Sequence, residues 1–106
     1  MIMTDLLEKK TYYNVLYAYY KLLLTEKQQQ IFEFYYEEDY SISEISEELG
    51  ISRNAVFDTL KKVVKQLDKY EELLELYKKE QLRNKIYDKY YSEETKQLIN
   101  ELKEME

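Results

Sequence analysis

A chain of 106 residues with no Cys, no His, no Pro, one Gly and a net charge of −6 has the size of one small domain and excludes several kinds of site. Without Cys or His there is no disulfide, no Cys/His zinc site, no thiol nucleophile and no histidine base. The single Gly also excludes the Gly-rich loops that bind nucleotide phosphates. We therefore expect no enzyme, no cofactor and no metal site.

The lack of Pro and the abundance of Leu, Glu, Lys and Tyr predict an all-α fold. We expect a single helical domain over residues 1–106, with N-terminal helices in 1–39, a helix-turn-helix in 40–70 and C-terminal helices in 71–106. The first ten residues, MIMTDLLEKK, do not form a secretory signal, and no apolar stretch approaches the ~18 to 20 residues that span a bilayer. A cytoplasmic protein without membrane contact is expected.

The first predicted helix runs from Asp5 to Leu24 and is apolar over most of its surface. Such a helix needs cover on most sides. In a domain this small a second copy is the natural cover, so we expect a homodimer. The apolar residues recur three and four apart in two stripes, one made of Tyr13, Leu16, Tyr17, Tyr20, Leu23 and Leu24 and the other of Tyr12, Val15, Tyr19 and Leu22.

A second helix is predicted to open at Glu26, because Thr25 and Gln28 have the spacing of a capping box. The acidic residues 37–39 that follow it predict a solvated turn beside the positive end of the next helix. They lack the spacing of a calcium loop, so we do not expect a cation site there. The residues of the second helix that we expect to point inward are Ile31, Phe34 and Tyr35.

Residues 40–70 have the pattern of a helix-turn-helix. Ser41 and Glu44 form another capping box. Gly50 stands where a helix ends in a left-handed residue, and Ser52 can cap the helix that follows. We expect Gly50 and Ser52 to shape the turn. Apolar residues keep the helical period on both sides of it, with Ile42, Ile45 and Leu49 before it and Ala55, Val56, Leu60 and Val63 after it.

The segment LTEKQQQIFEFYYEEDYSISEISEELGISRNAVFDTLKKVVKQL resembles the region 4 helix-turn-helix of bacterial sigma factors. It resembles much more closely the YlxM family of small helix-turn-helix proteins. That similarity extends over most of the chain, from the Tyr- and Leu-rich first helix to YEELLELY after the helix-turn-helix. The resemblance implies a cytoplasmic bacterial protein that regulates the signal recognition particle pathway.

The second helix of the motif departs from sigma region 4 on its exposed face. Arg53 and Asn54 can read base edges, but Phe57 offers only apolar or stacking contact and Asp58 repels phosphate. YlxM proteins are similar to this chain at that place, with an aromatic residue followed by Asp. The departure therefore argues against promoter recognition and favours the narrower family.

The acidic residues lie mostly outside the second helix of the motif. Residues 53–69 hold five basic and two acidic side chains, a net charge of +3. Such a stripe can neutralise only ~3 to 4 phosphates, so binding should be weak and salt-dependent. An equally open alternative is a solvated face on which Asp58 pairs with Lys61 or Lys62. The candidate nucleic-acid contacts are Arg53, Asn54, Phe57, Lys61, Lys62 and Lys65.

Beyond residue 69 no helix breaker appears, and apolar residues continue at alternating three and four spacing to Tyr77. That register then fails, which predicts a bend or a shifted seam near residue 80. Ser92 is expected to cap a last helix. The apolar residues of this last helix are Leu98, Ile99, Leu102 and Met105.

We expect a regulatory nucleic-acid-binding protein that acts in the signal recognition particle pathway by contact with its RNA or its GTPase. Two other classes stay open. A DNA-binding transcription regulator would prefer particular duplex sequences and would be a dimer with half-sites about 34 Å apart. A protein-binding adaptor would use the acidic surface and would not touch nucleic acid.

Overall fold

A computed structural model describes residues 2–106 of the chain, with side chains from Lys9 onward. Every regular element in this range is helical, which confirms the predicted all-α fold with a helix-turn-helix and further helices after it. None of the helices described is both long enough and apolar enough to cross a membrane. The elements are α1 (Ile2–Tyr20), the 3-10 helix η1 (Lys21–Leu23), α2 (Glu26–Phe32), the π-helix η2 (Glu33–Glu37), α3 (Ile42–Leu49), α4 (Arg53–Leu74), α5 (Leu76–Tyr90) and α6 (Lys96–Glu104).

The chain divides after Glu75 into two compact units, so the single domain of residues 1–106 stays a prediction. Unit 1 ends at Glu75 and unit 2 comprises Leu76–Glu106. Glu75 is the C-cap of α4 and has left-handed backbone angles, with φ 54°. The interruption predicted near residue 80 therefore lies about one turn earlier. Its position was missed because a Glu in this conformation carries no Gly or Pro signal.

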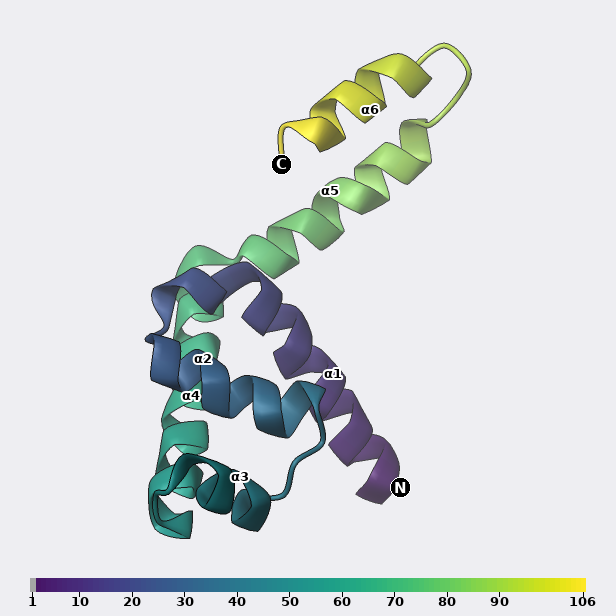
Figure 1. The fold of residues 1–106 in the computed structure, drawn as a ribbon. Coiled ribbons are helices and arrows are strands. Elements are labelled where there is room, and N and C mark those ends of the chain that lie inside the picture. Colours follow the sequence, from purple (N-terminus) through teal and green to yellow (C-terminus); the bar gives the residue numbers. More distant parts are fainter. Residues whose placement is uncertain (1) are drawn as a thin grey trace. The chain divides into compact units, whose positions relative to one another are not determined.

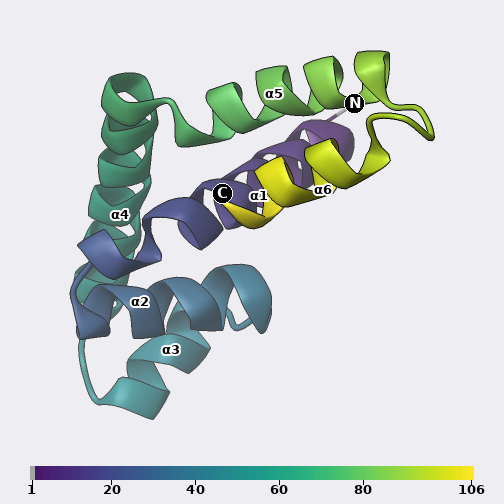
Figure 2. The same ribbon diagram turned by 90° about the horizontal axis from the view of Figure 1, so that it is seen from above.

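In unit 1, α4 is the helix against which α1, α2 and α3 pack (Figure 1). Its buried side chains lie three and four residues apart, which places them on one face of the helix. Figure 2 shows α2 and α3 side by side, and both contact α4. Val56, Leu60 and Val63 of α4 are buried as predicted, and Leu67 is buried in addition. Ala55, also predicted to point inward, is half-buried.

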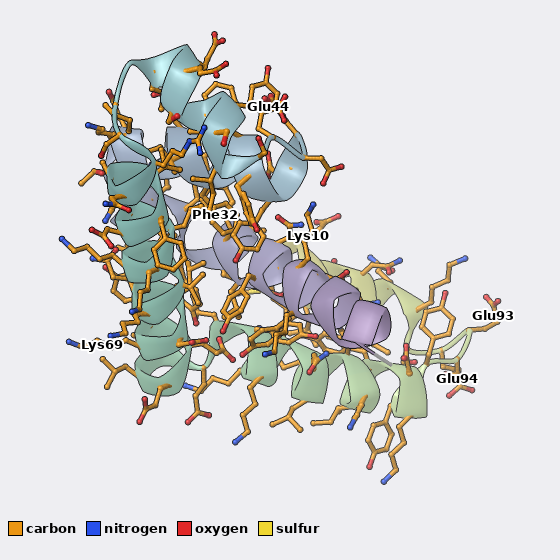
Figure 3. The ribbon with its side chains drawn as sticks, turned by 90° about the horizontal axis from the view of Figure 1, so that it is seen from below. Lys10, Phe32, Glu44, Lys69, Glu93 and Glu94 are labelled. Carbon is orange, nitrogen blue, oxygen red and sulfur yellow. The ribbon has the colours of Figure 1, made fainter. Side chains whose placement is uncertain are left out.

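A stack of three aromatic rings joins α1 to α2 and η2. The ring centroids of Tyr17 and Phe32 are 4.2 Å apart, and those of Phe32 and Tyr36 are 4.4 Å apart. Phe32 is fully buried and lies among the helices of unit 1 (Figure 3). Ile31, Phe34 and Tyr35 pack into the core as predicted, Ile31 fully buried and the other two half-buried. Phe32 was not among the predicted inward residues, because α2 buries two neighbouring faces.

Three of the four predicted caps are confirmed. Thr25 and Ser41 each form a complete capping box, and the Ser52 hydroxyl accepts a hydrogen bond from the backbone N–H of Ala55. Each cap satisfies a backbone donor that the first turn of a helix leaves unpaired. Gly50 ends α3 with φ 66°, as predicted. The caps and the glycine therefore fix the short connection between α3 and α4.

Tyrosine hydroxyls of α1 donate hydrogen bonds to carboxylates on η2 and α4. Tyr13 donates to Asp68 at 3.0 Å and Tyr20 to Glu71 at 2.6 Å, while Tyr17 donates to Glu33. These bonds hold α1 against both elements. Burial, followed by the hydrogen bond to Asp68, raises the pKa of Tyr13 to about 12.

Unit 2 consists of α5 and α6, and its two buried side chains among the described residues are Tyr87 and Ile99. The Tyr87 hydroxyl donates to a Glu106 carboxylate oxygen at 3.0 Å, and Arg83 pairs with the same carboxylate. Ser92 does not cap the last helix as predicted, because α6 begins only at Lys96. Its hydroxyl instead accepts from the backbone N–H of Thr95, within the turn that precedes the helix.

The first helical segment ends earlier than predicted and leaves part of its apolar surface uncovered. The expected helix from Asp5 to Leu24 corresponds to α1 and η1. Leu24 is buried, but Leu22 is 90% exposed and Leu23 is 53% exposed. The homodimer that was expected to cover this surface stays a prediction.

We expect Gly50→Ala to lower the free energy of unfolding by about 1–2 kcal/mol, because left-handed backbone angles disfavour a Cβ. No atom lies within 4 Å of a Cβ built at this position, so steric overlap with a neighbour adds nothing. Gly50→Asn should cost less, since Asn adopts this conformation more readily. Urea unfolding measures both variants. An Asn variant as unstable as the Ala variant would show that backbone conformation is not the cause.

We expect Tyr13→Phe to change how stability depends on pH. The pKa of Tyr13 is raised from 10.0 to about 12, so the folded state holds the phenolic proton more tightly than the unfolded state. The stabilisation is complete below pH 10 and is lost as the pH rises toward the folded pKa. The difference in free energy of unfolding between the parent chain and Tyr13→Phe should therefore shrink between about pH 8 and about pH 11.

Urea unfolding at the two pH values tests this prediction, with the exposed Tyr91 mutated to Phe as the control. The control should follow the parent chain at both values. A Tyr13→Phe variant whose stability falls with pH as steeply as that of the parent chain would contradict it.

Candidate nucleic-acid interface

The outward face of α4 carries the predicted contact residues. Phe57, Lys61 and Lys65 are four residues apart and therefore lie one above the other on the helix. All three are exposed, as are Arg53 and Asn54 in the first turn. This arrangement follows from the opposite face of α4, whose buried stripe orients these positions toward solvent.

The lysines of this face are free of local ion pairs. Among the side chains described from Lys9 onward, no ion pair within 4.0 Å involves Lys61, Lys62 or Lys65. The alternative pairing of Asp58 with Lys61 or Lys62 is therefore not formed. Figure 3 shows Lys69 pointing away from α4 into solvent. The ammonium groups are available to an anionic partner.

The structure groups only some of the predicted residues. Successive residues of an α-helix are about 100° apart around the axis. Lys62 consequently lies on the far side of Lys65 from Lys61, and Arg53 and Asn54 lie at the N-terminal end of the helix. Phe57, Lys61 and Lys65 line one groove, and Lys62 does not belong to it.

This groove has a volume of about 320 Å³ and lies within unit 1. From α4 it takes the predicted residues Phe57, Lys61 and Lys65 together with Leu60 and Val64. The Phe57 side chain is 53% exposed. The groove thus combines an apolar floor, an exposed aromatic ring and two cations.

The opposite wall of the groove was not predicted from the sequence. It consists of Tyr35 and Tyr36 from η2 and Ile42 from α3. The spacing of Phe57, Leu60 and Val64 could have indicated an apolar strip on α4. No local pattern could have brought η2 beside it, because that contact depends on how α2 packs and on the wide turn of η2.

The two tyrosines of this wall contact each other edge to face, with centroids 5.1 Å apart. One face of the Tyr36 ring is covered by Phe32. Burial, followed by the neighbouring Tyr35, raises the pKa of Tyr36, so its phenol stays neutral to a higher pH than an ordinary tyrosine does. The neutral Tyr36 phenol adds no negative charge that would oppose an anion at the lysines.

A comparison with protein-family models matches residues 7–105 to UPF0122, which is described as "Putative helix-turn-helix protein, YlxM / p13 like". A UPF0122 protein of Listeria innocua is 43% identical over 89 residues, which cover 84% of this chain and 81% of the relative. A UPF0122 protein of Lactococcus lactis subsp. cremoris is 41% identical over 104 residues, which cover 94% and 92%.

A third relative, a UPF0122 protein of Streptococcus pneumoniae, is 44% identical over 82 residues, which cover 77% of this chain and 74% of the relative. These matches confirm the resemblance that the sequence of the helix-turn-helix suggested. They extend over both compact units, well beyond the motif itself. The chain therefore belongs to the UPF0122 family of YlxM- and p13-like helix-turn-helix proteins.

Proposed function

We propose that the protein is a regulatory RNA-binding protein that acts in the signal recognition particle pathway, by contact of α4 with the particle's RNA or its GTPase. The observation that supports the RNA contact is the exposed face of α4, where Phe57 lies beside Lys61 and Lys65. Neither lysine forms an ion pair with any side chain that the structure describes. The assignment to the signal recognition particle pathway depends on the resemblance to the YlxM family. Helix-turn-helix proteins commonly use this helix to bind nucleic acid.

The charge distribution favours a compact RNA over a long DNA duplex. The chain as a whole has a net charge of −6, and the segment 53–69 alone carries +3. Contacts that extend beyond this segment would bring phosphates close to acidic surface. Asp58, on the exposed face of α4, also repels the phosphates of a duplex lying along the helix.

The affinity should be modest and should depend steeply on salt. Three lysines can neutralise about three phosphates, which gives a slope of about −2 to −3 for the logarithm of the association constant against that of the salt concentration. A salt titration therefore reports how many of these lysines contact phosphate.

Replacing Lys61, Lys62 and Lys65 by Glu should lower the affinity for signal recognition particle RNA by more than about tenfold and flatten the salt dependence. Fluorescence anisotropy with labelled RNA, repeated across salt concentrations, measures both quantities. A random DNA duplex of equal charge serves as the competing ligand. The parent chain should prefer the RNA.

The matched control replaces Lys79, Lys85 and Lys96 by Glu. These exposed lysines lie in unit 2, and their reversal changes the net charge by the same amount. The control should keep most of the affinity. Equal losses in the two triple variants would show that only net charge matters, and unchanged binding after reversal of the α4 lysines would overturn the proposal.

A further inference from the structure

We propose that the groove beside Phe57 receives one unpaired base of the RNA, which stacks on the Phe57 ring while Lys61 and Lys65 hold the adjoining phosphates. This inference rests on the proposed function that the protein binds RNA. It names the part of the RNA that is recognised: an unpaired nucleotide in a loop or bulge.

The exposure of Phe57 is the first observation. α4 buries one stripe and is otherwise polar around this position, yet it places a Phe ring that is 53% exposed at the edge of an apolar groove. The floor beside the ring is formed by Leu60 and Val64, which offer no hydrogen bonds. A group that fits here has apolar faces, as a nucleobase has.

The second observation is the position of the charges. Lys61 and Lys65 lie on the same groove as Phe57 and are one helical turn apart, about 6 Å along the axis. Their flexible side chains can each hold a phosphate on either side of a base that enters between them. The groove therefore offers stacking and charge neutralisation together, which is how single-stranded nucleic acid is commonly bound.

The composition of the groove favours a base over a peptide helix. A helix that docks in a groove presents a row of apolar anchors. This groove, of about 320 Å³, combines its apolar floor with the two lysines Lys61 and Lys65. That combination suits a planar base with a phosphate on either side. A paired base cannot enter, because its neighbours cover its faces.

The test compares an RNA hairpin that has 2-aminopurine in its loop with a fully paired RNA of the same length. The parent chain should bind the hairpin more tightly and change the 2-aminopurine fluorescence on binding. Phe57→Leu keeps the apolar volume and removes the aromatic face. It should weaken hairpin binding by about tenfold, leave the paired RNA unaffected and abolish the fluorescence change.

The control is Tyr91→Leu in unit 2, because Tyr91 is 52% exposed and thus matches Phe57 as an exposed aromatic residue. Binding by this variant should equal that of the parent chain. If the parent chain binds neither RNA, the proposed function fails, and this inference fails with it. If the chain binds RNA with the salt dependence of the α4 lysines but Phe57→Leu leaves hairpin binding unchanged, only the stacking site is overturned.

Discussion

The packing of one face of α4 is the interaction on which the rest of unit 1 depends. α1, α2 and α3 all contact this helix, and its buried stripe of Val56, Leu60, Val63 and Leu67 is the surface they share. A helix that buries one stripe must leave its opposite side in solvent. The core therefore determines both the orientation of α4 and which residues a ligand can reach.

The acidic composition of the chain and the basic segment of α4 are compatible because most carboxylates lie outside residues 53–69, which carry a net charge of +3. Asp58 and Asp68 are the exceptions, and the exposed Asp68 lies about one turn beyond Lys65. Tyr13 donates a hydrogen bond to Asp68, which fixes the position of this carboxylate without removing its charge. The net charge of the chain consequently says little about the electrostatic potential at Lys61 and Lys65.

Local features of the fold could be predicted from the sequence, and features that depend on distant segments could not. Thr25, Ser41 and Ser52 were identified as caps because a cap depends on a few neighbouring residues. Gly50 was identified because the preference of Gly for left-handed angles is local. By contrast, the end of α4 at Glu75 has no breaker residue, and the burial of Phe32 depends on two other helices.

The residues of the candidate site show the same difference between local features, which could be predicted, and features that depend on distant segments. Phe57, Lys61 and Lys65 could be placed on one exposed face from their spacing alone, whereas Lys62 was grouped with them by charge and lies outside the groove. Tyr35, Tyr36 and Ile42 were missed because they reach the groove through tertiary packing. A sequence pattern thus indicated the helix that presents the site but not the wall that shapes it.

The composition of unit 2 has a consequence for local unfolding. With fewer than about 40 residues, a helical pair holds too small a core to be stable by itself, and here the buried side chains are Tyr87 and Ile99. The apolar residues Leu98, Leu102 and Met105 along α6 remain exposed. The rate of amide hydrogen exchange in α5 and α6 therefore reports whether these three apolar residues of α6 are covered in solution. Slow exchange there requires a covering surface, and fast exchange marks a pair of helices that opens independently of unit 1.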